Sequence, residues 1–432
     1  MDFKRYRIRK EFFGCLIHDR QSDAMYMYDK RSFQLFSQVI KTGSCEDQQA
    51  LNNMRQMGYI NDRNQPDYDF FENAVSSDIM SAPMTVHYVY THRCNLNCKH
   101  CYSKRAENMP EMNYEQKLKL LDQVADMGVF KILIGGGEPF TCKEFIPYLK
   151  ASVERGLYTR TFTNGLLLND EMIDELSKIQ LGGISVSVDS TEFDAYETIR
   201  GVRSLDTVIC NIKKLSSKCN YSISMSATIG STNLFSEDKL LDLAKECGVH
   251  RLKIRPTKPS GNALKNTEIE ISPDTYADYI KRIRKLYIDK GYDSSFVLDT
   301  HWGNVRLVCD GNTITLKDNP LPYDDFSCIA GKGILAIGPT GTVNSCGFLT
   351  SYFGESTDSI LKDDLNNIWQ KSQALISLRN IRPNPECVAC NFYSSCRGGC
   401  PARNLHAGLE FNAVDPWCPK NFFPMPLQDE NN

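Results

Sequence analysis

Between residues 84 and 290 the apolar positions follow two alternating patterns. Short runs rich in branched and aromatic residues predict buried strands, and longer stretches with apolar residues every three or four positions predict amphipathic helices. The predicted strands are Thr85–Tyr90, Phe130–Ile134, Thr159–Thr163, Gly183–Val188, Ile223–Ile229 and Arg251–Arg255. The predicted helices are Tyr114–Met127, Glu144–Arg155, Asp170–Ile179, Leu205–Lys218, Glu237–Cys247 and Pro273–Lys290.

This order of strand and helix predicts an α/β fold. Six strand-then-helix units favour a parallel sheet with the helices outside it. Right-handed crossovers would curl that sheet into a barrel or partial barrel, a (β/α)6 arrangement. Functional groups in such folds gather at the carboxyl ends of the strands. We therefore expect a site at that end.

Two regions flank the predicted barrel. Residues 1–80 predict a small α+β module, and residues 291–432 lose the periodicity and are rich in turns and cysteine. The module's expected strands are Tyr6–Arg9, Cys15–His18 and Ala24–Tyr28, and its helices Ser32–Lys41 and Gln48–Met57. Asn61–Pro83 is polar and acidic, which is typical of a linker. In the third region, Gly333–Ile337 and Gly341–Ser345 predict a hairpin.

Length and charge restrict the classes of function. A chain of 432 residues suggests two to three domains, and its net charge of −3 gives no electrostatic reason to expect nucleic acid. No run of about 18 apolar residues is present, and the basic N-terminus lacks an apolar segment. We expect a cytoplasmic protein without a membrane partner.

Seventeen cysteines are many for such a protein. Disulfides are disfavoured in the cytosol, so clustered cysteines indicate metal. Cys94, Cys98 and Cys101 directly follow the first predicted strand. Three thiolates at this spacing can hold three corners of a cubane iron–sulfur cluster and leave its fourth iron open to a small molecule. A zinc knuckle, or free thiols in a tight loop, is the alternative.

The triplet resembles the signature of radical S-adenosylmethionine (SAM) enzymes, in which the open iron chelates the methionine end of SAM. Gly135-Gly136-Gly137-Glu138-Pro139 resembles the motif that holds the SAM amino group in that superfamily. The resemblance implies that His100 packs on the adenine. It also assigns strand-end positions to the SAM ribose and carboxylate, although each is also typical of a simple turn. These positions are Asn164, Ser187, Asp189, Arg200 and Arg255.

Seven cysteines between residues 328 and 418 resemble the SPASM domain, an appendage of radical SAM enzymes that carries two auxiliary [4Fe–4S] clusters. The resemblance assigns four of them to an outer cluster: Cys387, Cys390, Cys396 and Cys418. It assigns three to an inner cluster: Cys328, Cys346 and Cys400. Two clusters need eight ligands, so the nearest upstream thiol, Cys309, is either the predicted eighth ligand or an ordinary buried cysteine. With the barrel triplet, the chain would hold three [4Fe–4S] clusters. Two zinc sites are the alternative.

The first 80 residues resemble the RiPP recognition element, a PqqD-like, winged-helix-like domain that binds the leader of a precursor peptide as an added strand. The resemblance rests on Phe12-Phe13-Gly14, on Ala24–Tyr28 and on Met57-Gly58-Tyr59-Ile60. A structural N-terminal cap is the alternative.

Together these resemblances predict a radical SAM/SPASM maturase. It would cleave SAM reductively to a 5′-deoxyadenosyl radical and crosslink side chains of a ribosomally made peptide through a C–S, C–C or C–O bond. An external reductant such as flavodoxin or ferredoxin is implied. Groups considered for a base are Tyr88, Tyr90, Asp299 and His301. The alternatives are a sulfatase-maturing or quinone-cofactor maturase, and a non-catalytic iron–sulfur protein that binds peptide or transfers electrons.

Overall fold

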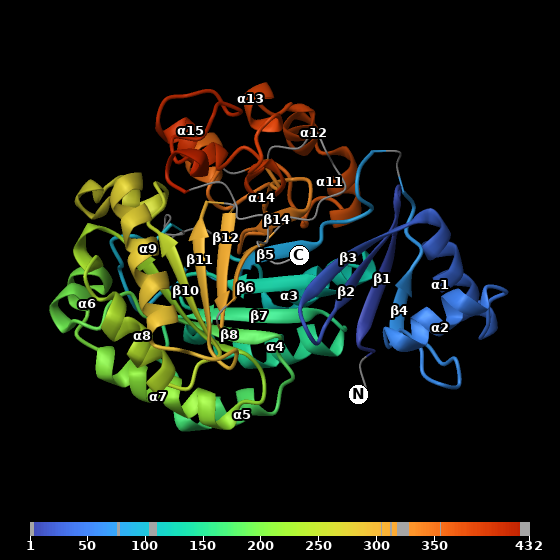
Figure 1. Cartoon of the computed structure of the whole chain (residues 1–432), viewed down its shortest axis with the longest axis horizontal. Coiled ribbons are helices and arrows are strands. Elements are labelled where there is room, and N and C mark those ends of the chain that lie inside the picture. Colours follow the sequence, from blue (N-terminus) through green and yellow to red (C-terminus); the bar gives the residue numbers. More distant parts are fainter. Residues whose placement is uncertain are drawn as a thin grey trace.

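We describe the fold from a computed structural model of the chain. The residues it describes are 4–75, 78–102, 110–303, 305–311, 313–317, 328–354 and 356–423. Figure 1 shows three parts: an N-terminal module, a central barrel wrapped by helices, and a C-terminal region packed on the barrel.

The six predicted strands form the centre of one large sheet. They run side by side in chain order and in parallel. Their bounds are β5 Thr85–Val89, β6 Lys131–Gly135, β7 Tyr158–Thr163, β8 Gly183–Ser187, β9 Ile223–Ile229 and β10 Arg251–Pro256. The α/β prediction is therefore confirmed.

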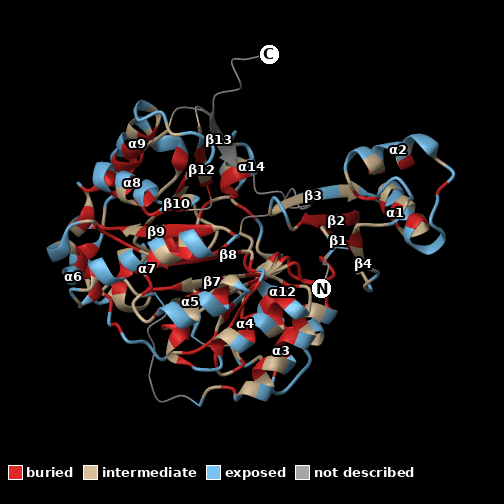
Figure 2. Ribbon diagram, turned by 90° about the horizontal axis from the view of Figure 1, so that it is seen from below, coloured by how far each residue is buried: buried red, intermediate tan, exposed pale blue. Residues whose placement is uncertain are grey.

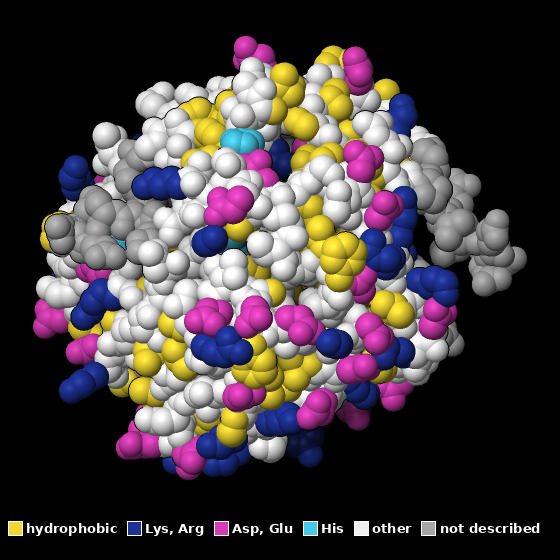
Figure 3. All heavy atoms as spheres, turned by 90° about the vertical axis from the view of Figure 1, so that its left-hand side faces the viewer, with side chains coloured by type: hydrophobic (Ala, Val, Ile, Leu, Met, Phe, Trp, Pro, Cys, Tyr) yellow, Lys and Arg dark blue, Asp and Glu magenta, His cyan; other side chains and the backbone are white. Residues whose placement is uncertain are grey.

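The predicted helices also form, and they cover the outside of the sheet. They are α3 Tyr114–Asp126, α4 Phe145–Glu154, α5 Asp170–Ser177, α7 Leu205–Lys218, α8 Glu237–Glu246 and α9 Pro273–Asp289. Within the barrel one further helix forms that was not predicted, α6 Phe193–Arg200, which packs Tyr196 and Ile199 inward. Figure 3 shows acidic and basic side chains intermixed on one face of the molecule, and the helices here carry ion pairs such as Lys213–Glu246.

The sheet extends further than the sequence suggests, because both of its edges come from the region that lost periodicity. On one edge lie β11 Val297–Trp302, which is parallel to β10, then β12 Val305–Asp310 and β13 Thr313–Lys317, which are antiparallel. On the other edge β14 Ile334–Ile337 pairs in parallel with β5, and β15 Val343–Asn344 completes the predicted hairpin. Apart from the hairpin, these strands were not predicted, because the sequence after residue 291 shows no clear periodicity.

The N-terminal module has its own four-stranded sheet in the order β3-β2-β1-β4 and its own apolar core. Its elements are β1 Tyr6–Glu11, β2 Gly14–Asp19, β3 Ala24–Asp29, α1 Lys30–Thr42, α2 Gln48–Gln56 and β4 Tyr68–Phe71. β4 lies within the stretch that was predicted to be a linker, so that prediction was wrong at this strand. Tyr68 is buried in the core of the module, and β4 pairs in parallel with β1. Figure 2 shows β1 and β2 as buried, whereas the edge strand β3 is largely open.

The module docks on the amino ends of the barrel strands. Arg7 donates to the carbonyl oxygens of Val129 and Gly156, which precede β6 and β7. In the turn between β2 and β3, the Asp23 carboxylate lies 2.5 Å from the Lys131 ammonium at the start of β6. The module therefore closes the end of the barrel opposite to the predicted site.

The C-terminal region consists of short helices and loops. They are α10 Thr350–Phe353, α11 Leu365–Lys371, α12 Gln373–Asn380, α13 Pro385–Val388, α14 Tyr393–Cys396 and α15 Pro401–His406. Two indoles tie the region to the rest of the chain: Trp369 Nε1 donates to the Met80 carbonyl, and Trp302 Nε1 to the Trp417 carbonyl, each at 2.7 Å. Among the described residues, no helix has the length and apolarity needed to cross a membrane.

Candidate functional site

The loop after β5 brings three thiols together. Cys98 is buried, Cys101 is half-buried and Cys94 is exposed, and the three act electrostatically on one another. Burial raises the pKa of Cys98 to about 11, although the Arg200 guanidinium, 3.8 Å from its Sγ, opposes this shift. The free thiol is therefore protonated at neutral pH, and binding of iron would release a proton.

The glycines after β6 bring their loop against the cysteine loop. Gly137 N donates to the Thr91 carbonyl and Glu138 N to the Arg93 carbonyl, both at 2.8 Å. A Cβ on Gly137 would lie 2.2 Å from the Arg93 carbonyl oxygen. Gly136 has φ +151°, and its Cβ would lie 2.6 Å from the Thr91 carbonyl oxygen. Only glycine allows this approach, so the motif positions the cysteine loop as well as any ligand.

Glu138 joins the ends of β6 and β7. Its fully buried carboxylate accepts hydrogen bonds from Asn164 N at 2.7 Å and from Thr163 Oγ1 at 2.9 Å. Burial raises the pKa of Glu138 to about 7. The Asn164 side chain in turn donates to Asn95 Oδ1 at 2.8 Å, within the cysteine loop. These bonds fix the relative position of the three loops.

Asp189 is the centre of a second network, at the end of β8. Its buried carboxylate lies 2.6 Å from Arg200 Nε and 2.8 Å from His100 Nε2, and it accepts a bond from Thr228 N. Burial alone would raise the pKa of Asp189, but Arg200 and His100 hold it well below its usual range. Three predicted SAM contacts are therefore bonded to one another. Contact of His100 with adenine stays a prediction.

The remaining predicted SAM contacts lie along the same rim. Ser187 is the last residue of β8 and is half-buried. Pro139 opens a buried 3-10 turn, Pro139–Thr141. Arg255 is the next-to-last residue of β10, across the barrel. The structure thus gathers all predicted SAM contacts at the carboxyl ends of β5 to β10.

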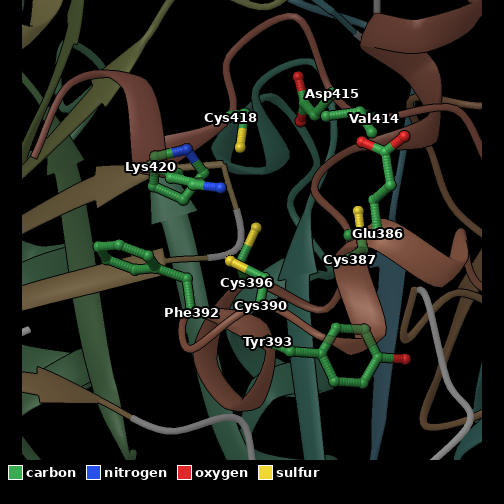
Figure 4. A pocket seen from close by; sticks show the side chains of 12 residues that line it. Glu386, Cys387, Cys390, Phe392, Tyr393, Cys396, Val414, Asp415, Cys418 and Lys420 are labelled. Atoms are coloured by element: carbon green, nitrogen blue, oxygen red, sulfur yellow. The ribbon is translucent and has the colours of Figure 1, made fainter. Parts of the chain in front are cut away.

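Four cysteines of the C-terminal region line one cavity of about 90 Å³. Figure 4 shows Cys387 from α13, Cys396 from the end of α14, and Cys390 and Cys418 from the adjoining loops around this cavity. Burial raises the pKa of Cys387 to about 11 and that of Cys396 to about 12. The quartet matches the set assigned to the outer cluster, and four converging thiols fit such a group.

Cys328, Cys346 and Cys400 form a separate triplet around a small apolar cluster. Burial raises the pKa of Cys328 to about 12, and Cys346 and Cys400 act on it in the same direction. Lys258, just beyond the end of β10, acts on Cys328 and Cys346. The triplet therefore faces the mouth of the barrel, and it fits three ligands of an inner cluster.

Cys309 lies apart from this triplet, which favours the alternative of an ordinary buried cysteine. It is fully buried in the barrel core, on β12, opposite Leu298. Leu298 pairs in turn with Leu252 at the start of β10. The four residues from Leu252 to the end of β10 at Pro256 span about 13 Å, and Lys258, whose charge acts on the triplet, lies beyond that end. The reason is that β12 runs antiparallel and carries Cys309 towards the amino end of the sheet.

One pair that the sequence analysis missed links the two C-terminal cysteine groups. The buried side chains of Arg403 and Asp415 form an ion pair, and Asp415 Oδ2 accepts a bond from Cys400 N at 2.6 Å. The charge of Arg403 acts on Cys396 as well as on Cys400. The only sequence signal was the position of Arg403 three residues after Cys400. In the described part of the chain, no three His, Cys, Asp or Glu side chains surround a point suited to a single metal ion.

Comparison with known proteins agrees with these two sites. Residues 88–230 match the model of the radical SAM superfamily, and residues 328–391 match the SPASM iron–sulfur cluster-binding domain. The mycofactocin maturase MftC of Mycobacterium tuberculosis is 26% identical over 340 residues, covering 78% of this chain and 83% of that protein. The PqqA peptide cyclase of Granulibacter bethesdensis is 22% identical over 347 residues, covering 78% and 87%.

A solved structure also shares the whole fold. Streptococcus suis SuiB bound to the precursor peptide SuiA superposes with a TM-score of 0.77 at 17% identity, covering 96% of this chain and 98% of that one. The likeness therefore includes the N-terminal module as well as the barrel and the C-terminal region.

Proposed function

We propose that this protein, an enzyme with a radical SAM domain and a SPASM domain, is a maturase that crosslinks side chains of a ribosomally made precursor peptide. The observation that carries the proposal is the fusion of both cysteine sites to an N-terminal module with an open edge strand, in an arrangement that matches 96% of the chain to a precursor-peptide complex. The names of the curated relatives, a maturase and a peptide cyclase, support it.

In this proposal the barrel triplet holds the cluster that activates SAM. Cys94, Cys98 and Cys101 supply three ligands, and the Gly135–Pro139 loop, with Glu138, keeps their loop in place. When bound, the cluster and SAM together supply a 5′-deoxyadenosyl radical by one-electron reduction. The chain's own contribution is to position SAM and the target carbon and to exclude water.

The C-terminal thiols hold two auxiliary clusters in this proposal, so that the chain carries three. Crosslinking removes two hydrogen atoms and is a net oxidation, so an electron has to leave the substrate. The inner triplet faces the barrel mouth, and the outer quartet lies beyond it, which suits an electron exit path. An external flavodoxin or ferredoxin would reduce the barrel cluster.

The N-terminal module would bind the leader of the precursor. β3 is an edge strand, and its Tyr26 and Met27 are 41% and 42% exposed. An added strand is held by backbone hydrogen bonds, with side-chain contacts setting its register. β3 therefore offers both an unpaired backbone edge and two large apolar side chains.

The test is anaerobic reaction of the iron-loaded enzyme with each short peptide encoded beside its gene, followed by mass spectrometry. A product lighter by two hydrogen atoms indicates a crosslink. The matched control replaces Cys94, Cys98 and Cys101 with Ala, which should remove about four of about twelve irons and abolish SAM cleavage. If no neighbouring peptide changes mass while the enzyme cleaves SAM, peptide maturation is refuted. A sulfatase-type substrate then becomes the next to test.

A further inference from the structure

The interior of the barrel is open and lined by polar side chains. Side chains alternate along each strand, so that on β5 Val86 and Tyr88 pack into the outer core while His87 points inward. β5 is a central strand between β14 and β6, yet His87 is exposed. Its exposed surface must therefore face a space within the barrel. The charge of Arg255 on β10 acts on His87 on β5, which indicates that the sheet curls around this space.

Positive charge dominates the lining of this space. The two carboxylates at this space, Asp299 and Asp23, already have cationic partners. Asp299 pairs with Arg251 at 3.1 Å and with Arg306 at 2.6 Å. Asp23, from the N-terminal module, pairs with Lys131 and lies 3.9 Å from Arg160. The inward positions of β6, β7, β10 and β12 supply six cations: Lys131, Arg160, Arg251, Lys253, Arg255 and Arg306. Two of them, Lys253 and Arg255, form no ion pair or hydrogen bond within the described part of the chain.

Lys253 is the more deeply buried of the two, with 8% of its surface exposed. Burial, together with the neighbouring guanidiniums of Arg160, Arg255 and Arg251, holds the pKa of Lys253 well below its usual range. Asp299, the opposing charge, is already shared between two arginines. A buried ammonium without a partner is costly, and such groups are characteristic of binding sites where a ligand supplies the counter-charge.

The carboxylate of SAM does not account for this lysine. SAM has one carboxylate, and the strand-end position that suits it on β10 is Arg255, at the rim. Lys253 lies two residues further into the barrel, about 7 Å along the strand. Its counter-charge must therefore come from a molecule that reaches past the rim, as the target segment of a substrate does.

We propose that Lys253 is the centre of an anion site inside the barrel, and that this site takes a carboxylate of the substrate. The inference deepens the proposed function, on which the identification of the ligand as a peptide rests. The segment that enters the barrel then carries an Asp or Glu side chain, or ends in the peptide's C-terminal carboxylate.

The test is anaerobic calorimetry with three small probes on iron-loaded enzyme saturated with SAM. N-acetylglutamate N-methylamide presents a side-chain carboxylate, N-acetylglutamine presents a C-terminal carboxylate, and N-acetylglutamine N-methylamide has neither. One or both acids should bind at least about tenfold more tightly than the neutral probe. The acid that binds identifies the source of the carboxylate. Equal binding of all three probes would overturn the proposal.

Lys253→Met should remove this preference, and Lys253→Gln should do the same. The control is Lys281→Met, which removes an exposed lysine whose side chain is 54% accessible on α9 and should leave the preference intact. Lys253→Met should also raise the thermal midpoint of the ligand-free protein, because a buried polar group without a partner is replaced by an apolar side chain. Undiminished preference in both variants, or loss of thermal stability in both, would refute the site.

These probes need neither leader recognition nor turnover. If carboxylates bind through Lys253 but no neighbouring peptide is modified, the proposed function fails and the anion site stands. If a peptide is modified but the probes show no preference, the anion site fails and the function stands.

Discussion

Gly137→Ala tests whether the glycines after β6 hold the cysteine loop. The new Cβ would lie 2.2 Å from the Arg93 carbonyl oxygen, with the Arg93 carbonyl carbon and the His92 oxygen both at 2.7 Å. All three atoms are backbone, so the loops must separate by about 0.8 Å to reach a tolerable 3.0 Å. The bonds from Gly137 N to Thr91 and from Glu138 N to Arg93 then weaken, at a cost of about 1 kcal/mol each.

The measurable result should be loss of iron from the barrel cluster and slower cleavage of SAM. We expect the variant to retain less iron and to cleave SAM about 100-fold more slowly, because a displacement near 1 Å at a reacting centre has that effect. Gly135→Ala is the matched control, since its Cβ meets only the Phe162 side chain, at 3.6 Å. Iron content and the electron paramagnetic resonance signal of the reduced cluster are compared without SAM. Equal retention in the two variants would show that Gly137 does not position the cysteine loop.

Three other predictions follow from the placement of single residues. Cys309→Ala should leave the iron content unchanged while Cys328→Ala lowers it, and a matching loss in both would return Cys309 to the inner cluster. Cys390→Ala should strip the outer site yet leave some 5′-deoxyadenosine formation, with crosslinked product lost; normal product from the soluble variant would contradict an essential role. Proline at Tyr26 or at Met27 should, at one of the two, strongly weaken leader binding measured by fluorescence anisotropy, with SAM cleavage without peptide unchanged. Unchanged affinity in both folded variants would locate leader binding elsewhere.

Much of the barrel was predictable because its outward positions are consistently apolar. The strands β5 to β10 were predicted to within about two residues at each end, since residues such as Ile132 and Ile134 pack under helices. β11 was missed because its inward side chains, Asp299 and His301, break that pattern. β4 was missed because it is four residues long and lies within a polar stretch.

The cysteine groups were predictable from spacing, but their bonding was not. Local spacing correctly brings together Cys387, Cys390 and Cys396, whereas the direction of a distant strand decides the position of Cys309. Likewise, the glycine motif predicts a ligand loop, but only the packing reveals that Gly137 touches the Arg93 backbone. Both placements depend on contacts between residues that lie far apart in the sequence, and a short motif does not specify such contacts.

If β3 holds the leader, as proposed, the closure of the barrel at its amino end would set a minimum length on the substrate. β3 adjoins that closed end, where Asp23 pairs with Lys131, while the thiols of the cysteine loop lie at the other end. β7, of six residues, spans about 20 Å between the two ends, and an extended chain covers at most about 3.6 Å per residue. A peptide held by β3 therefore needs at least about six residues before its reactive position, and more to pass around the outside. The enzyme would then select its target residue by its distance from the leader along the precursor as well as by its chemistry.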